Sequence, residues 1–297
     1  MKKLRKIKFI ALLLITVMQF AFVPVQKAQA YSNPATVPLL SVSNFTALAA
    51  STITSPTGPT VLNNGDLGSN GVCTNFIAPC TGPINGTIVG GTIQLANTAA
   101  TTGQTDATAA VTNANGRVAD TTIASGLLNG LTLTQGVYDV PFAVTNLTGD
   151  LTLSGDANSV FIFRAASSLI TASTSRVLLT GGVQACHVFW TVGSQATFDG
   201  TTQFVGTVFA QSSIVFTAGG ATLAGRAIAQ TAAITFRNTT VNNSTCAAAS
   251  TTTAAPTFPN TGIAPDKKSD TLWNFILPTG IVVVLYVIYI VRKKRAM

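Results

Sequence analysis

Hydroxyl-bearing side chains recur through the second half of the chain, each within a short pattern of four residues. The pattern occurs four times, as SLIT (168–171), QATF (195–198), SIVF (213–216) and AITF (233–236), with second residues 27, 18 and 20 positions apart. Methyl groups of such side chains order nearby water, and hydroxyl groups hydrogen-bond it. The chemistry that these residues could perform is therefore the ordering of water on a surface, provided that the fold aligns them.

The period of two along a β-strand decides which of these residues point outward. If Leu169, Ala196, Ile214 and Ile234 face the interior, their neighbours on both sides face solvent. The outward residues suited to such a surface are Ser168, Ile170, Thr197, Ser213, Val215, Thr217 and Thr235. Asp199 and Arg237 fall beside them and hold water strongly, so they suit only the edge of the surface. The alternative is that outward Thr residues simply follow their β-propensity.

The elements that must position these side chains are short strands. Each quartet follows an apolar run, such as residues 160–163, and is trailed by a third short run, such as residues 176–179. Three strands per turn, with a turn every 18–27 residues, predict a mainly β fold, a parallel β-helix with three faces. Equivalent residues on neighbouring coils would stack about 4.7–4.9 Å apart and form straight ladders.

Two earlier segments have sequence patterns that differ from that of the four quartets. Residues 33–93 are rich in Thr, Gly, Pro and Asn and predict irregular strands that open the solenoid. Between 95 and 119, apolar residues recur at helical spacing, and Gly116 is a stop signal. These residues are Leu95, Ala99, Ala107, Ala110, Val111, Ala114 and Val118. Because Thr and Gly are frequent there, such a helix needs support from packing along the solenoid.

Charge is segregated along the chain. Its net charge is +8, yet residues 31–250 contain five Arg, seven Asp, no Lys and no Glu, a net charge of −2. Phosphate binding needs clustered basic residues on the folded surface, so nucleic acid is not an expected partner.

The remaining reactive side chains are four cysteines, one histidine and a few carboxylates. Cys73 with Cys80 and Cys186 with Cys246 are candidate disulfides, and four free buried thiols are the alternative. With His187 as the single histidine and no CxxC spacing, a metal site is not expected.

A hydrolase is a further class, because parallel β-helices host enzymes that cleave polysaccharides with paired carboxylates. Asp139, Asp150, Asp156 and Asp199 fall mainly near turns, where Asp commonly caps backbone groups. His187 lies in an apolar run, as a packed residue would. We therefore expect neither catalysis nor a cofactor.

The ends of the chain carry targeting signals. Residues 1–30 combine a basic start, an apolar stretch and Ala28-Gln29-Ala30, as in a secretory signal peptide. After a solenoid domain at 31–246 come an Ala/Ser/Thr/Pro linker at 247–271, a transmembrane anchor at 272–291 and a basic tail at 292–297. The tail places the C-terminus in the cytoplasm and the body outside.

Several stretches in order resemble the ice-binding-like family of antifreeze proteins and ice adhesins. The most distinctive is QACHVFWTVGS at 184–194, preceded by FTALA (45–49), TGPTV (57–61), GDLG (65–68), GGTI (90–93), GLTLTQGVY (130–138) and SVFIF (159–163). The resemblance implies a discontinuous, right-handed, triangular β-solenoid with a long helix alongside. It also implies a flat face that binds ice, and a surface adhesin for another solid or a glycan is the alternative.

FPNTG at 258–262 resembles the wall-sorting signal of surface proteins, with Phe258 in place of the usual Leu. The resemblance implies a sortase that cleaves between Thr261 and Gly262 and joins the protein to the cell wall. Retention in the membrane is the alternative.

Overall fold

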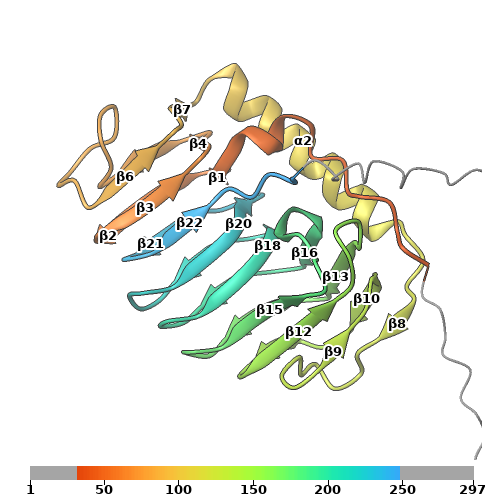
Figure 1. The fold of residues 1–297 in the computed structure, drawn as a ribbon. Helices are drawn as coiled ribbons and strands as arrows, with labels where there is room; N and C mark the ends of the chain where they lie inside the picture. Colours follow the sequence, from red (N-terminus) through yellow and green to blue (C-terminus); the bar gives the residue numbers. More distant parts are fainter. Residues whose placement is uncertain (1–31, 248–297) are drawn as a thin grey trace, which may run out of the picture. The chain divides into compact units, whose positions relative to one another are not determined.

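Every strand pair in the computed structural model is parallel, and the strands stack into coils with three faces. The structure describes residues 32–247 (Figure 1). Face A consists, in spatial order, of β8 (Thr121–Thr122), β10 (Gly136–Val140), β13 (Phe161–Ala165), β16 (Val188–Val192), the second halves of β18 (Gln203–Ala210) and β20 (Thr222–Ala229), β1 (Phe45–Ala49), β4 (Asp66–Ser69) and β7 (Ile93–Leu95). Face B consists of β11 (Val144–Leu147), β14 (Ser168–Thr171), β17 (Ala196–Phe198), β19 (Ile214–Phe216), β21 (Ile234–Arg237), β2 (Thr52–Thr57) and β5 (Val72–Thr74). Face C consists of β9 (Thr132–Leu133), β12 (Asp150–Ser154), β15 (Arg176–Thr180), the first halves of β18 and β20, β22 (Thr240–Asn242), β3 (Thr60–Asn63) and β6 (Gly86–Val89).

The order of coils in space differs from their order in the sequence. β1 pairs with β20, β2 with β21 and β3 with β22, so the first strands of the chain extend the stack beyond its last coil. We call this junction the seam. The helix α2 (Thr98–Asn115) then carries the chain back along the stack to β8, as Figure 1 shows. The predicted discontinuous solenoid is confirmed. Residues 45–95 form seven strands, with register shifts at Phe45–Ala47 and Thr54–Thr57, and they lie at the far end of the stack, beyond its last coil in sequence.

The interior contains a column of aromatic rings that crosses the seam. Its members, in order, are Tyr138, Phe163, Trp190, Phe204, Phe198, Phe216, Phe236 and Phe76. Ring centroids are 4.0 Å apart for Phe163 and Trp190 and 6.4 Å apart for Phe76 and Phe236. Aromatic pairs at such distances contribute about 0.5–1.5 kcal/mol beyond the area they bury. The column therefore holds the coils in one register, which keeps the outer faces regular.

The helix α2 packs on Face A through its smallest residues. Asn97 starts it by accepting a hydrogen bond from the Ala100 N–H at 3.0 Å, and Gly116 follows its last residue. The buried residues are Ala100, Gly103, Ala107, Ala110 and Ala114. A helix here is confirmed, but it is shorter than expected, because Leu95 lies in β7 and Val118 lies beyond the helix end. Ala99 is exposed on the outer side of the helix. The helix α2 therefore covers Face A.

Both expected disulfides form, so the alternative of free thiols was wrong. Cys73 is bonded to Cys80, seven residues away, and Cys186 to Cys246, 60 residues away. Cys186 and His187 lie in the short 3₁₀ helix η2 (Ala185–His187) that leads into β16.

The predicted signal peptide at 1–30, sorting residues Thr261 and Gly262, membrane anchor at 272–291 and basic tail at 292–297 lie outside the described residues. Within 32–247, no helix is long and apolar enough to cross a membrane.

Candidate functional surface

The central outward column of Face B is the ladder that the sequence pointed to, extended in both directions. Its members, paired in register, are Asn146, Ile170, Thr197, Val215, Thr235, Thr54 and Thr74. With about 4.7–4.9 Å between neighbouring strands, seven positions span roughly 29 Å. We call this set the central ladder.

The direction of the side chains follows from the residues between them. Leu169, Ala196, Ile214, Ile234 and Ile53 are fully buried at the intervening positions. The period of two then turns the central ladder outward. All four of its predicted members (Ile170, Thr197, Val215 and Thr235) lie where the sequence placed them.

Two flanking columns widen Face B. One contains Val144, Ser168, Gln195, Ser213, Ala233, Thr52 and Val72, and the other contains Thr148, Ala172, Asp199, Thr217, Arg237 and Thr57. The predicted residues Ser168 and Ser213 are in the first flank, and Thr217 is in the second. Both charged residues of these columns, Asp199 and Arg237, lie in the second flank, at one edge of the face.

The hydroxyl groups of Face B are in two states. Thr74 donates to Thr54 at 2.8 Å, and Thr217 donates to the Asp199 carboxylate at 2.6 Å. By contrast, the hydroxyls of Ser168, Ser213 and Thr235 form no hydrogen bond within the described residues, so they can bind water.

Apolar groups lie between these hydroxyls. Ile170 is 40% exposed and Val72 is 58% exposed, while Val215 is half-buried. Face B therefore presents methyl groups and hydroxyl groups side by side, held on paired strands. Such a surface can order a layer of water without a reactive group.

The sequence pattern missed part of this surface. Thr52, Thr54 and Thr74 come from strands far earlier in the chain and were not expected on it. Their signal is visible in retrospect, because TIT (52–54) and VCT (72–74) repeat the outward–inward–outward order of AIT (233–235). What could not be read from spacing is that these strands join the same sheet.

The other two faces are less suited to a continuous contact. Face A is covered by α2, whose buried side chains meet outward residues of the sheet such as Ile162, Phe189 and Ile228. Face C is open, but an ion pair between Arg176 and Asp150 (2.6 Å) lies across its strands β12 and β15. Charged groups retain their own water and interrupt an apolar array.

Each carboxylate considered for catalysis has a structural partner. Asp139 accepts from Arg164 at 2.5 Å, and Asp199 accepts from Thr217. The hydrogen bond from Arg176 holds the pKa of Asp150 below its ordinary value. The backbone N–H of Asn158 and the hydroxyl of Ser159 do the same to the pKa of Asp156. These contacts are those of turn caps and surface ion pairs.

Comparison with known proteins gives a consistent answer. A family model described as "Ice-binding-like" matches residues 47–242. An "Ice-binding protein" of Nostoc sp. (strain HG1) is 37% identical over 226 residues, which are 75% of this chain and 80% of the relative. The crystal structure of an ice-binding protein from the Antarctic ascomycete Antarctomyces psychrotrophicus superimposes with a TM-score of 0.64 at 32% identity, covering 70% of this chain and 98% of that one. An ice-binding protein from an Antarctic biological consortium gives a TM-score of 0.63 at 35% identity, covering 75% and 96%. This chain therefore belongs to the ice-binding-like family.

Proposed function

We propose that this protein binds ice through Face B. The observation that carries the proposal is the central ladder, seven outward residues in register on a face that the helix leaves open. The similar proteins named as ice-binding support the same conclusion. The contact set comprises the predicted residues Ser168, Ile170, Thr197, Ser213, Val215, Thr217 and Thr235, together with Thr52, Thr54 and Thr74.

Binding would rely on a surface that is already in place. Methyl groups of Thr and the side chains of Ile170 and Val215 order adjacent water, while free hydroxyls such as that of Thr235 tether it. The aromatic column beneath limits movement of the strands, so little conformational entropy is lost on contact. Ice is the partner and no cofactor is needed.

The charged flank sets the limit of the contact. Asp199 and Arg237 bind water in their own geometry, and both lie in one outer column. We propose that ice contacts the central ladder and the flank that carries Ser168 and Ser213. Thr217 lies at the margin of the contact set, because its hydroxyl already donates a hydrogen bond to the Asp199 carboxylate.

The protein is further proposed to act outside the cell and to be attached to its envelope. Two disulfides in the described domain fit an oxidising compartment. The signal-like residues 1–30 and the apolar residues 272–291 support export and anchoring. Mass spectrometry of the mature C-terminus distinguishes a chain that ends at Thr261, linked to the wall by a sortase, from one retained in the membrane.

Single substitutions on two faces test the binding surface. Thr235→Lys and Thr54→Lys place a charge in the central ladder, and Thr222→Lys makes the same change on exposed Face C. Outward changes of this kind usually alter stability by no more than about 0.5 kcal/mol. We expect thermal hysteresis and uptake into growing ice to be lost in the first two variants and kept in the third. Equal activity in all three would show that Face B is not the contact surface, and an inactive wild-type protein would refute ice binding.

A further inference from the structure

The seam runs through the middle of the proposed contact surface. Thr235 on β21 is the last ladder residue of the C-terminal coils, and its partner Thr54 lies on β2 near the start of the chain. Thr74 follows on β5. Within Face B, the hydroxyl-rich end of the ladder is thus joined to the rest at the docking of β1–β3 on β20–β22.

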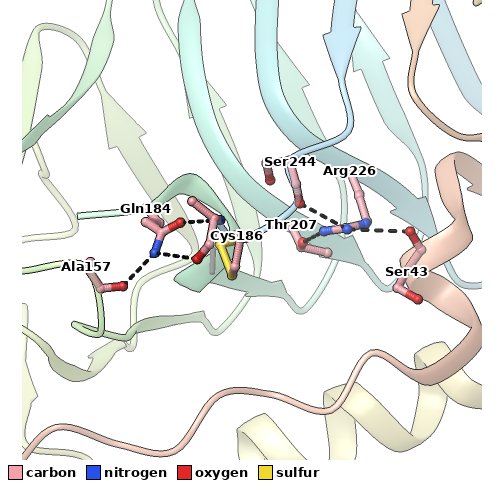
Figure 2. Close-up of a disulfide and its surroundings, with 9 residues drawn as sticks. Ser43, Ala157, Gln184, Cys186, Thr207, Arg226 and Ser244 are labelled. Carbon is pink, nitrogen blue, oxygen red and sulfur yellow. Dashed lines mark hydrogen bonds between the residues drawn. A yellow bond between two sulfur atoms is a disulfide. The ribbon is translucent and has the colours of Figure 1, made fainter. Parts of the chain in front are cut away.

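The end of the described chain makes further contacts near this junction. Residues 243–247, which we call the strap, leave β22 and reach η2. There Cys246 is bonded to Cys186, and the Ala247 N–H donates to Gln184 Oε1 at 2.7 Å. Figure 2 shows the disulfide and, beside it, the side chain of Arg226.

Arg226 links the strap to both sides of the seam. Its guanidinium donates to the Ser244 carbonyl in the strap at 3.1 Å, to Thr207 Oγ1 on β18 at 3.3 Å and to the Ser43 carbonyl at 3.5 Å (Figure 2). Asn243 in the strap also donates to the Ser43 carbonyl, at 3.1 Å. Ser43 lies in the 3₁₀ helix η1 (Leu40–Asn44), directly before β1.

Burying the charged side chain of Arg226 costs free energy, which its hydrogen bonds must offset. The residue is 3% exposed and forms no ion pair within residues 32–247. Burial of a cation without a counter-ion is unfavourable. Burial lowers the pKa of Arg226 to about 10, which leaves it charged at neutral pH. A charged donor forms stronger hydrogen bonds than a neutral one. Those of Arg226 reach the Thr207 hydroxyl and the carbonyls of Ser43 and Ser244, which come from the two ends of the described domain.

We propose that Arg226 and the Cys186–Cys246 disulfide form a clasp that holds β1–β3 in register on β20–β22. Arg226 is then a positioning residue for Face B, and ice contact depends on the oxidised state of the disulfide. This proposal rests on the proposed function of Face B. The structural path from Arg226 to Face B is short. Arg226 immediately precedes Ala227, which pairs with Ala47 of β1, and β1 leads into β2 on Face B. Loss of the clasp would let Thr54 and Thr74 move relative to Thr235.

The redox step balances with an external dithiol. Cys246 is exposed, so a dithiol can attack the disulfide there. The dithiol gives up two electrons and two protons and becomes a disulfide, while Cys186 and Cys246 become thiols.

Hydrogen exchange on the full chain, with ice adsorption measured in parallel, tests the clasp. Arg226→Met removes the donors at similar length, and Arg226→Lys keeps the charge and some of them. A C186S/C246S double variant opens the disulfide, with C73S/C80S as its matched control. Strands β14 and β17, which belong to Face B but lie away from the seam, serve as the internal reference.

We expect Arg226→Met and C186S/C246S to speed exchange in β1 and β2 by about tenfold or more, with β14 and β17 unchanged. Ice adsorption should fall with them, and Arg226→Lys should restore much of both. Exchange that is unchanged at the seam, or that rises equally in all strands, would overturn the clasp. If a variant does not fold, the wild-type protein with and without dithiothreitol, compared with C73S/C80S treated alike, gives the same readout. A wild-type protein that fails to adsorb to ice would refute the proposed function, whereas the exchange data would still decide the clasp.

Discussion

The two disulfides should contribute unequally to stability, because they close loops of very different length. The bonded cysteines are 60 residues apart in Cys186–Cys246 and seven apart in Cys73–Cys80. In the chain-entropy model, loops of these lengths restrict the unfolded chain by about 4 and about 2 kcal/mol at 25 °C. Cys73 and Cys186 are both buried, so replacement by Ser removes packing of one buried side chain in each pair. We therefore expect C186S/C246S to lose about 2 kcal/mol more than C73S/C80S.

Guanidinium unfolding of the two double variants and the wild type, followed by circular dichroism without reductant, measures this difference. For a domain of this size, 2 kcal/mol corresponds to about 4–8 °C in Tm, which calorimetry resolves. Equal losses, or a larger loss for C73S/C80S, would refute the reasoning. The short loop would then stabilise the fold by contacts that the entropy of the unfolded chain does not describe.

Two further predictions concern the core and a surface charge. Phe216→Ala should cost about 3–5 kcal/mol in denaturant unfolding, because the ring is fully buried between Phe198 and Phe236, and a loss below about 1 kcal/mol would contradict the stacked column. The pKa of Asp150 is lowered by Arg176, so their pairing stabilises the fold above the ordinary pKa of 3.8 and is lost as pH falls below it. Arg176→Gln should raise that pKa toward 3.8 in a carboxyl NMR titration, and an unchanged value would show that the pair does not interact in solution.

Sequence reasoning found those parts of the fold that repeat along the chain. The four quartets lie on consecutive coils, so their spacing revealed the strand period and the outward side chains of β14, β17, β19 and β21. β2 and β5 have the same alternation, yet they follow β21 in the sheet although they precede it in the sequence. Spacing along a chain carries no information about such a rearrangement, and the family resemblance supplied it.

Arg226 shows a second limit of sequence reasoning. In β20 it occupies an outward position of Face A, where an arginine would ordinarily extend into solvent. It is buried because Ser43 and Ser244, from opposite ends of the domain, close over it. A residue covered by remote segments gives no local signal. The helix shows a milder form of this limit, since the Asn97 cap fixed its start and buried Ala100 in place of Ala99.

The seam also dictates when the domain can be completed. β1 is among the first strands to be synthesised, but its partner β20 is among the last, and Ala47 must wait for Ala227. Contacts between residues so distant in sequence form late and slowly. The hydroxyl ladder across Thr235 and Thr54 therefore cannot exist on a partly synthesised chain. A protein built in this way acquires its complete outward ladder only after nearly all of the domain has been synthesised, so no fragment that ends before β20 can present that surface.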